Sequence, residues 1–395
     1  MQGRTTAIFI IYFCPFPTLS IAAVWVVHGR TVTQPVTSPA TQPNEGGTTV
    51  QALVKYGRRN GDVEVRDVAE PTLPPDRVLI EVKAAGVCGS DLHMWREHQS
   101  WAIKEPLILG HEFCGVVAQV GDAVSGFQVG ERVACETAAE VCGQCVYCLS
   151  GNYNLCPHRL GYGALADGAF TRYVVARPQI LHRIPDNVPF EHAALTEPIC
   201  VAYNALVEKT LMKPGDLVVI QGPGPIGIMA LQIVRLRGAG TIVVLGTDVD
   251  THRLEVAAEL GAHYTLNVQR EDAAKLIQGL GDGFGADLVV DCTGVSRALK
   301  QSMELVRPNG RITKIGWGPQ PLDFSLDPLV GKAVTLQGSF SHTYPTWERV
   351  LTLLATGQVN LEPVIGGVYP LAEWEEAFTK MEEGASVKSV LRLSD

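Results

Sequence analysis

Four cysteines, the residue type that most often holds structural zinc, lie close together in the first half of the chain. They follow the spacing C-x2-C-x2-C-x7-C and are Cys142, Cys145, Cys148 and Cys156. Four thiolates at such short spacing can surround one zinc ion tetrahedrally, and they leave no coordination position for water or substrate. Disulfides are a poorer interpretation because neighbouring CxxC pairs are strained. A nucleic-acid zinc finger is disfavoured too, since Arg159 is nearly the only basic residue nearby, so we predict a structural zinc.

A second set of metal-ligand residues is spread over three segments. The segment "GVCGSDLH" offers Cys88, "LGHEFCG" offers His111 and Glu112, and "LTEPIC" adds Glu197. A thiolate, an imidazole and a carboxylate make a three-ligand zinc site whose fourth position is open to a substrate oxygen. Zinc there acts as a Lewis acid and lowers the pKa of an alcohol, which helps hydride to leave carbon. Each residue alone also has an ordinary structural explanation, and the spacing by itself does not assign the site.

The segment "VVIQGPGPIG" joins a predicted strand to a predicted helix through Gly222, Gly224 and Gly227. Glycines here let the chain turn tightly and bring backbone N–H groups to a pyrophosphate, which the helix N-terminus also attracts. Asp248 lies 21 residues beyond Gly227, where a carboxylate binds ribose hydroxyls and repels a 2′-phosphate. This favours NAD over NADP. Arg253, one helical turn beyond, weakens the preference because it can pair with a phosphate.

The elements that must position these residues change character along the chain. From residue 48 to about 184, alternating apolar and polar runs predict β-strands. Near residue 191 the apolar residues take helical spacing. Farther on, strands are predicted at 217–220, 241–246, 287–291 and 311–316, with helices that begin near 226, 251, 271 and 296. This βαβ pattern predicts a parallel sheet wound on both faces, and after residue 331 one more strand and two amphipathic helices close the chain.

The predicted fold class is therefore α/β, with a β-rich domain and a doubly wound domain. A chain of 395 residues exceeds what one hydrophobic core usually supports. The predicted boundaries are 1–48 for an apolar segment and linker, 49–200 for a β-rich catalytic domain with the four-cysteine lobe at 135–160, 201–335 for a nucleotide-binding domain, and 336–395 for a return segment that completes the catalytic domain.

The composition narrows the class of protein. The chain is 46% hydrophobic and 18% charged, which is typical of a globular protein. A net charge of −9 without any long basic run argues against a nucleic-acid partner. The chain has ten cysteines, and those outside the four-cysteine cluster lie singly in apolar or glycine-rich surroundings. That pattern is typical of a reducing compartment, so we expect a cytoplasmic protein.

The first 48 residues differ from the rest. Residues 5–28 carry no Lys, Arg, Asp or Glu, and a Thr/Pro/Gln-rich linker follows them. A signal peptide, a membrane anchor interrupted by two prolines, and a start codon assigned too far upstream are three interpretations. We favour the third, in which the segment is not in the mature protein, and we expect no membrane association of the core.

Several motifs follow one another in the order of a known family. They are "GVCGSDLH", "GHE", the four-cysteine lobe, "GAFTRYVV", the "EP" at 197–198 and "GPGPIG". In these the chain resembles the zinc-dependent medium-chain alcohol dehydrogenases over roughly residues 50–392. It is most similar to the branch of polyol (sorbitol/iditol), butanediol and threonine dehydrogenases. The resemblance implies a catalytic domain folded like the GroES chaperonin, a Rossmann domain, and an active site between the two.

The resemblance also implies a role for each site residue. The implied ligands of a catalytic zinc are Cys88, His111 and Glu112, with Glu197 as an alternating ligand or a partner of the zinc-bound water. The implied ligands of a structural zinc are Cys142, Cys145, Cys148 and Cys156. The implied proton relay to solvent is Ser90 and His93, since a proton must leave oxygen while hydride leaves carbon. The implied NAD contacts are Gly222, Gly224, Ile226, Gly227, Asp248 and Arg253, with Thr293 and Gly316 nearer the nicotinamide.

Two departures from the family bear on the substrate. Sorbitol-type enzymes generally carry an arginine–aromatic pair where residues 341–342 of this chain are Ser-His, which speaks against sorbitol itself. Threonine-type enzymes usually have Asp where this chain has Glu197. The loop 94–106 lies between two implied zinc ligands, and we expect Trp95, Arg96 and Trp101 either to shape the substrate pocket or to make a subunit contact.

We predict an enzyme that uses NAD and two zinc ions, one catalytic and one structural. It oxidises a secondary alcohol of a small polyol, cyclitol or sugar-like molecule to a ketone. The alternatives are a threonine-type amino-alcohol dehydrogenase and a catalytically silent nucleotide- or metal-binding protein on the same fold. The resemblance further implies a homodimer or homotetramer.

Overall fold

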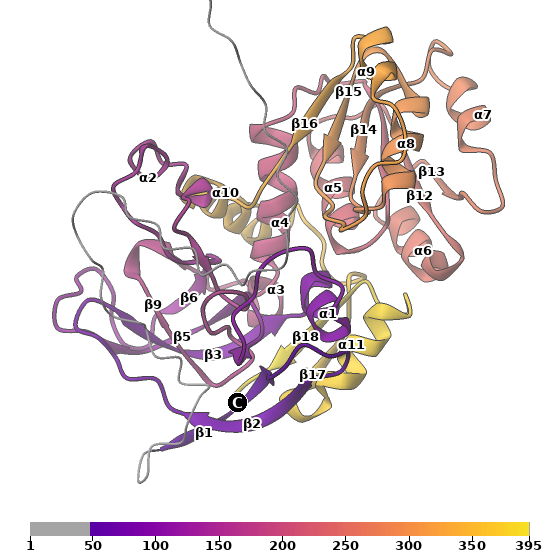
Figure 1. Ribbon diagram of the computed structural model, residues 1–395. Coiled ribbons are helices and arrows are strands. Elements are labelled where there is room, and N and C mark those ends of the chain that lie inside the picture. Colours follow the sequence, from indigo (N-terminus) through magenta and orange to yellow (C-terminus); the bar gives the residue numbers. More distant parts are fainter. Residues whose placement is uncertain (1–47, 395) are drawn as a thin grey trace, which may run out of the picture. The chain divides into compact units, whose positions relative to one another are not determined.

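The computed structural model describes residues 48–394 and contains two kinds of sheet, one mostly antiparallel and one parallel (Figure 1). The three interpretations of the N-terminal segment concern residues that lie outside this described part. None of the helices between residues 48 and 394 combines the length and the apolar character that crossing a membrane requires.

Antiparallel pairing organises the part of the chain that carries the expected metal ligands. Strand β3 (Val78–Gly86) pairs with β5 (Glu112–Val120), and β6 (Arg132–Cys135) extends the sheet beyond β5. Both β3 and β5 are rich in β-branched residues and mostly buried, as expected of central strands. The other strands of this part are β1 (Thr49–Lys55), β2 (Val63–Ala69), β4 (Leu107–Ile108), β7 (Ala138–Glu140), β8 (Leu160–Gly161), β9 (Tyr173–Ala176) and β10 (Leu181–Arg183).

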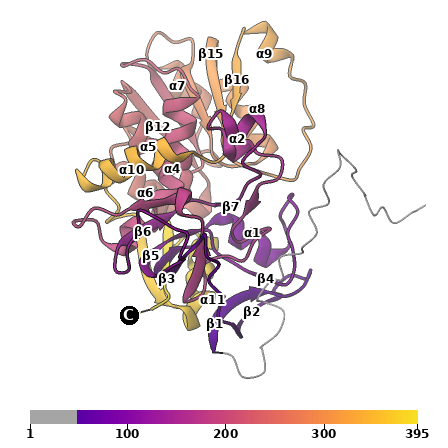
Figure 2. The same cartoon turned by 90° about the vertical axis from the view of Figure 1, so that its left-hand side faces the viewer.

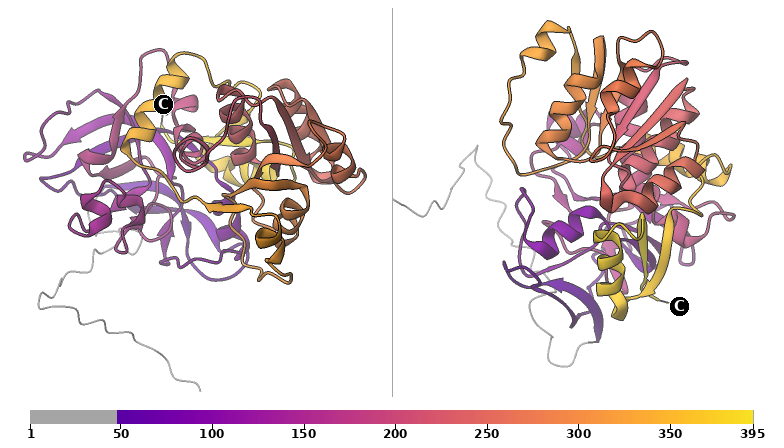
Figure 3. Two further views of the ribbon diagram at one scale, coloured as in Figure 1. Left: turned by 90° about the horizontal axis from the view of Figure 1, so that it is seen from above. Right: turned by 90° about the vertical axis from the view of Figure 1, so that its right-hand side faces the viewer.

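The end of the chain returns to this antiparallel sheet. Strand β18 (Lys388–Arg392) pairs with β3, and β17 (Ile365–Pro370) lies parallel to β18 (Figure 3). Helix α11 (Trp374–Glu382) packs against β18. The sequence predicted α11 but neither strand, because β17 is interrupted by two glycines and β18 is short. The return places Lys388 beside the first residue of β5.

Six parallel strands form the second sheet, in the order β13-β12-β11-β14-β15-β16 (Figure 1). This is the order of a doubly wound Rossmann sheet, and it confirms the predicted fold class. The strands are β11 (Leu217–Gln221), β12 (Thr241–Gly246), β13 (Tyr264–Asn267), β14 (Ala286–Asp291), β15 (Val306–Lys314) and β16 (Thr335–Gly338). The helices between them are α5 (Pro225–Leu236), α6 (Thr251–Glu259), α7 (Ala273–Gln278), α8 (Ser296–Leu305) and α9 (Asp327–Gly331). In this sheet β13 was not predicted, because its four residues bury little apart from Leu266.

Two helices connect the sheets. Helix α4 (Thr196–Tyr203) follows the short α3 (Phe190–Ala193) and continues into a π-helical turn, η4 (Asn204–Glu208). Helix α10 (Tyr344–Ala355) packs along α4 (Figures 1 and 2). Buried side chains of α4 and α10 share one core with α5 and β11. This packing fixes the position of Glu197, in the first turn of α4, relative to the residues at the start of α10.

The structure corrects one expectation about the loop 94–106. Trp95 is buried and packs edge-on against Trp374 and Phe378, with ring centroids 5.6 and 5.7 Å apart. The guanidinium of Arg96 lies 3.5 Å above the Trp95 ring and donates two hydrogen bonds to Glu382. The prediction that Trp95 contacts a substrate or a second subunit is therefore wrong, because its ring is buried against α11. Arg96, which stays partly exposed, is bound to the same helix.

Candidate active site

The expected catalytic zinc ligands come from two segments that the antiparallel sheet brings together. Cys88 precedes α1 (Gly89–Arg96), and its backbone N–H donates to Asp91 at 2.9 Å. Glu112 is the first residue of β5 and His111 directly precedes it, after Gly110, whose φ of 92° only glycine adopts readily. The ligand atoms of Cys88, His111 and Glu112 all lie within 4.8 Å of one another. One thiolate, one imidazole and one carboxylate so close together fit a zinc ion with an open position.

The electrostatics of His111 also fit a cation. Burial lowers the pKa of this imidazole, but the negative charges of Cys88 and Asp91 raise it to about 10. Asp91 is fully buried, and its Oδ1 lies 3.9 Å from His111 Nδ1. A positive charge beside Cys88 and Asp91 is thus favoured. A bound metal ion can supply this charge in place of the proton on His111.

The carboxylate of Glu112 forms a buried ion pair that the sequence did not reveal. Lys388 Nζ lies 2.7 Å from Oε1 and 2.6 Å from Oε2 of Glu112, and both side chains are fully buried. Burial raises the pKa of Glu112, and the ammonium of Lys388 opposes that increase. Lys388 lies in the last strand, 276 residues from its partner, so no local pattern could have linked them. We infer that Lys388 orients Glu112 toward the metal position.

Glu197 lies outside the group of ligand atoms that are within 4.8 Å of one another. Its Oε1 accepts a hydrogen bond from His342 Nε2 at 3.0 Å, and both residues are buried. Burial raises the pKa of Glu197, but the hydrogen bond from His342 lowers it below the ordinary value. The charge of Glu197 is near enough to His111 to raise the pKa of that imidazole. The contact with His342 was not predicted, because the sequence only marked His342 as unusual for the family.

The expected proton relay lies on α1. Ser90 Oγ is buried and has no hydrogen-bond partner within residues 48–394, so it is free to bond a substrate hydroxyl. His93 follows three residues later, on the same side of the helix, and its side chain is exposed. Partial desolvation and the nearby His98 lower the pKa of His93, which keeps its imidazole neutral and able to accept a proton at neutral pH.

A row of aromatic side chains extends from His93. The ring of Trp101 lies edge-on to His93 at 6.3 Å and edge-on to Trp317 at 6.0 Å. Trp317 in turn lies 5.8 Å from Phe340. Trp317 is 53% exposed and Phe340 is 37% exposed. Of the residues expected to shape the substrate pocket or to make a subunit contact, Trp101 therefore lies next to the relay histidine, and Trp317 is an addition that the sequence did not suggest.

The three glycines after β11 have distinct structural reasons. Gly222 has a φ of 87°, and a Cβ on Gly227 would lie 1.9 Å from the Gly222 carbonyl oxygen, so the turn requires both. A Cβ on Gly224 would meet nothing within 4 Å. Ile226, half-buried, lies in the first turn of α5. Open space at Gly224, directly before the N-terminus of a twelve-residue helix, fits a pyrophosphate.

Asp248 follows β12 and is exposed. Its Oδ1 accepts hydrogen bonds from Asn267 at 2.5 Å and from Arg270 at 2.7 Å, and these two partners lower its pKa. The guanidinium of Arg253 instead bonds to Asp250 at 3.1 Å and to the carbonyl oxygens of residues 381 and 386. The charge of Arg253 is therefore engaged within the protein, and the arginine that lies at Asp248 is instead Arg270.

The expected nicotinamide contacts lie at the carboxyl ends of neighbouring strands. Asp291 accepts hydrogen bonds from the Thr293 N–H at 2.9 Å and from its hydroxyl at 2.7 Å. Lys314 Nζ bonds to Asp291 at 3.0 Å and to the Gly316 carbonyl at 2.9 Å. A Cβ on Gly222 would lie 2.8 Å from the methyl group of Thr293. These contacts place the expected NAD residues together at the edge where doubly wound sheets bind nucleotides.

The four clustered cysteines come together around α2 (Val146–Leu149) as a second group that could hold a metal ion. Their sulfur atoms lie 3.5 Å (Cys145–Cys148), 3.6 Å (Cys142–Cys156) and 3.9 Å (Cys142–Cys148) apart. Such distances exclude disulfides, whose sulfurs are about 2.05 Å apart. They agree with a tetrahedron around zinc, since Zn–S bonds of about 2.3 Å separate the sulfurs by about 3.8 Å. All four ligand atoms lie within 4.8 Å of one another.

This four-cysteine lobe is connected to the segment that carries His342. Asn154 donates from Nδ2 to the Phe340 carbonyl at 2.8 Å, and the Tyr344 N–H donates to the Tyr153 hydroxyl at 2.5 Å. Asn204, from η4, donates to the Ser341 carbonyl at 2.8 Å. Ser341 has a φ of 54°, which is unusual for a residue with a side chain. Backbone contacts to two different elements therefore hold residues 339–344 in place.

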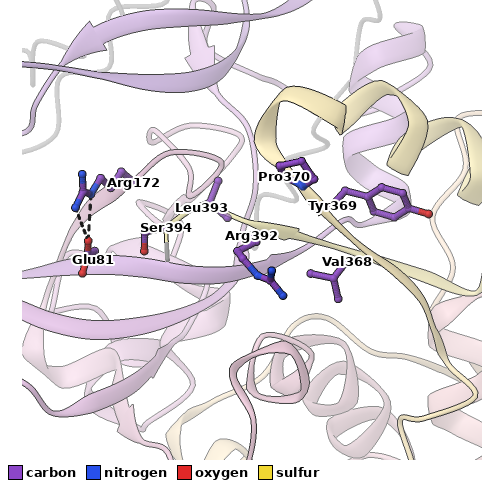
Figure 4. A pocket seen from close by; sticks show the side chains of 8 residues that line it. All are labelled: Glu81, Arg172, Val368, Tyr369, Pro370, Arg392, Leu393 and Ser394. Carbon is purple, nitrogen blue, oxygen red and sulfur yellow. Dashed lines mark hydrogen bonds and ion pairs between the residues drawn. The ribbon is translucent and has the colours of Figure 1, made fainter.

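A pocket of about 570 Å³ opens at the sheet of β3, β9, β17 and β18 (Figure 4). It is lined by Glu81, Arg172, Val368, Tyr369, Pro370, Arg392, Leu393 and Ser394. Arg172 bonds to Glu81 at 2.8 Å. None of the expected zinc or NAD residues lines this pocket, so it is separate from the candidate active site.

Two protein families match most of the described chain. The alcohol dehydrogenase GroES-like domain matches residues 74–186, and the zinc-binding dehydrogenase family matches residues 225–356. The sorbitol dehydrogenase of Halalkalibacterium halodurans is 40% identical over 87% of this chain and 99% of its own length. The D-arabitol-phosphate dehydrogenase of Enterococcus avium is 38% identical over 82% of this chain and 92% of its own. The solved structure of L-idonate 5-dehydrogenase from Escherichia coli has a TM-score of 0.77 at 28% identity, covering 88% of this chain and 99% of that one.

Proposed function

Because the chain belongs to the zinc-dependent alcohol dehydrogenase family, we propose that it oxidises a secondary alcohol of a polyol, cyclitol or sugar-like molecule to a ketone and reduces NAD. The single observation that carries the proposal is the meeting of Cys88, His111 and Glu112 within 4.8 Å, beside a buried serine hydroxyl that has no partner in the described chain. Two relatives support the substrate class, since their names give sorbitol and D-arabitol phosphate.

The residues of this chain divide the work of the reaction. Cys88, His111 and Glu112 would hold zinc, which when bound supplies Lewis acidity toward the alcohol oxygen. Ser90 accepts the hydrogen bond of that hydroxyl and passes its proton along α1 to His93, which releases it to solvent. The charge of Glu197 stabilises positive charge at the metal position. Thr293 and the backbone near Gly316 position the nicotinamide to receive hydride.

Three further features belong to the proposal. The four cysteines of the lobe hold a second, structural zinc. The nine cysteines of the described chain are all unpaired, which supports a reducing, cytoplasmic location. The chain forms a homodimer or homotetramer: β16 is an edge strand of the parallel sheet, and its Leu336 and the nearby Val330 are exposed. Light scattering on the purified protein tests the assembly, and a monomeric mass contradicts it.

The experiment that tests the proposed reaction is NADH formation by the zinc-replete protein with a panel of alcohols. The panel contains polyols, cyclitols, aldoses, sugar acids, phosphorylated polyols, butanediol and threonine. We expect turnover with at least one polyhydroxylated alcohol and none after zinc removal by a chelator. Preference for threonine would favour an amino-alcohol dehydrogenase. Bound NAD and zinc without turnover on any member would favour the catalytically silent alternative.

A further inference from the structure

Arg159 has no ion-pair partner within the described chain. Among residues 48–394, no carboxylate lies within ion-pairing distance of its guanidinium, whereas several other described arginines form such pairs. Its Nε is buried and has no hydrogen-bond partner in this part of the chain. Nη2 is engaged by donation to the Thr137 hydroxyl at 2.7 Å. A desolvated guanidinium without an anion beside it costs free energy. The presence of Arg159 at this position therefore indicates an anionic partner that is not part of the described chain.

The surroundings of Arg159 position it firmly. Its backbone N–H donates to the carbonyl of Cys156, the last ligand of the four-cysteine lobe, at 3.0 Å. A Cβ on Gly161 would lie 3.0 Å from Arg159 Nη1, so glycine there leaves room for the guanidinium. Thr137, which orients Nη2, is itself buried. The side chain is thus held in place, which is the condition for specific recognition of a ligand.

The guanidinium lies beside the candidate active site. It lies 5.5 Å from the centre of the Phe340 ring, at the end of the aromatic row that begins at His93. Burial lowers its pKa, and the nearby charges of Glu197 and Glu136 raise it. Glu197 itself is bonded to His342, and it stays beyond ion-pairing distance of Arg159. The segment that follows Arg159 passes along the chain before His111: a Cβ on residue 163 would lie 2.9 Å from the carbonyl oxygen of residue 110.

We propose that Arg159 binds an anionic group, a carboxylate or a phosphate, of the alcohol substrate. This proposal rests on the proposed function and narrows its substrate class from polyhydroxylated alcohols in general to acidic or phosphorylated ones. Nη1, which has no hydrogen-bond partner in the described chain and is not among its buried unpaired atoms, is the donor left to the anion, and a guanidinium matches carboxylate and phosphate oxygens geometrically. The half-exposed rings of Trp317 and Phe340 then cover the carbon chain between the anionic group and the reacting carbon.

The test compares matched substrates that differ in charge. NADH formation is measured with sorbitol, D-gluconate and sorbitol 6-phosphate, for the wild-type protein and for Arg159→Gln. Arg172→Gln is the matched control, because Arg172 is an exposed arginine in the separate pocket. We expect the wild type to favour a charged substrate, and Arg159→Gln to lower its kcat/KM about 100-fold while changing that of sorbitol little. The charged substrate that loses more identifies carboxylate or phosphate as the recognised group.

Other outcomes separate the inference from the proposed function. Efficient oxidation of sorbitol with no preference for either charged substrate, or equal losses on all three substrates in Arg159→Gln, overturns the role of Arg159 and leaves the proposed reaction intact. If no member of the panel is oxidised, calorimetric titration of the zinc- and NAD-loaded protein with D-gluconate and with inorganic phosphate decides the inference directly. Binding that is lost in Arg159→Gln and kept in Arg172→Gln supports it, and the absence of binding to the wild type overturns it.

Discussion

The indole Nε1–H of Trp347 donates to His342 Nδ1 at 2.7 Å, and the other ring nitrogen of His342 lies 3.0 Å from Glu197 Oε1. An indole nitrogen can only donate, so Nδ1 must accept and Nε2 must carry the hydrogen that Glu197 receives. Trp347 therefore selects one tautomer of His342, and that tautomer holds the carboxylate of Glu197 by one oxygen. The charge of Glu197 is kept in one place beside the metal ligands.

We expect Trp347→Phe to lower kcat about tenfold or more while NAD affinity stays unchanged, because a hydrogen bond to a charged group contributes about 1.5–3 kcal/mol. Phenylalanine keeps most of the buried volume but frees Nδ1, so His342 can turn or change tautomer. Nitrogen NMR of the labelled protein checks the tautomer directly. Trp374→Phe is the control, since the Trp374 ring packs against Trp95 on a different helix. An unchanged His342 spectrum in Trp347→Phe would contradict the assignment.

Lys388→Met should destabilise the protein by about 3–5 kcal/mol, because it leaves the fully buried carboxylate of Glu112 without its partner. The pKa of Glu112, already raised by burial, should rise further once the ammonium is gone. Urea unfolding at neutral pH measures the loss. The control is the double variant Lys388→Met with Glu112→Gln, which removes both charges and should recover part of the stability. Equal stability of Lys388→Met and wild type would show that the pair is not buried in solution.

Gly224→Ala and Gly227→Ala should separate cofactor binding from folding. A Cβ at residue 224 meets nothing within 4 Å, so the alanine variant should keep its melting temperature but bind NAD about tenfold or more weakly, because the methyl group occupies the pyrophosphate space. A Cβ at residue 227 would lie 1.9 Å from the Gly222 carbonyl oxygen, so that variant should lose about 1–3 kcal/mol of stability. Calorimetry and NADH fluorescence measure both quantities. Equal effects of the two substitutions would contradict this division.

Cys88→Ser and Cys145→Ser should each remove one zinc ion with different consequences. Cys88→Ser should abolish turnover and leave NAD binding nearly intact, because Cys88 holds no part of the nucleotide site. Cys145→Ser should mainly reduce stability, because a four-ligand site stabilises its loop without touching substrate. Metal analysis should give two zinc ions per wild-type chain and one in each variant. Full activity of zinc-analysed Cys88→Ser would refute its place in the active site.

The pair of Arg96 and Glu382 should give a small stabilisation that depends on pH. The hydrogen bonds from Arg96 lower the pKa of Glu382, so the contribution is complete above the unfolded-state pKa of Glu382 and is lost as pH falls through the lower folded-state value. Glu382→Gln should therefore lower the melting temperature at neutral pH and have less effect in acid, below both pKa values. The pair is partly exposed, so the difference should stay below about 1 kcal/mol. Arg96→Gln should leave the KM for substrate unchanged. A raised KM would show that Arg96 contributes to the substrate pocket.

The sequence predicted the features that local chemistry determines. The spacing of the four cysteines, the glycine turn after β11 and the alternation of strands and helices from β11 to β15, apart from the missed β13, all depend on residues close together in the chain. The three ligands Cys88, His111 and Glu112 required the family resemblance, because they come from separate segments that only the pairing of β3 with β5 brings together.

The remaining features depend on tertiary packing that sequence patterns do not carry. Lys388 reaches Glu112 only because β18 returns to β3, and Trp347 reaches His342 only because α10 packs along α4. Trp95 was misjudged for a related reason. In the sequence it looks like a pocket residue because it lies between two metal ligands, but the α11 helix, which covers it, comes only near the end of the chain.

The hydrogen bonds that hold residues 339–344 have a consequence for how this protein can change during evolution. Asn154 and Asn204 hold the segment by the carbonyl oxygens of Phe340 and Ser341, and Tyr153 holds it by the N–H of residue 344. None of these contacts depends on which side chain stands at 340 or 341. New side chains can therefore be tried at residue 340 while the path of the backbone is kept, so a related protein can change its range of alcohol substrates by substitution at that one position. At residue 341 the positive φ limits the choice of side chain.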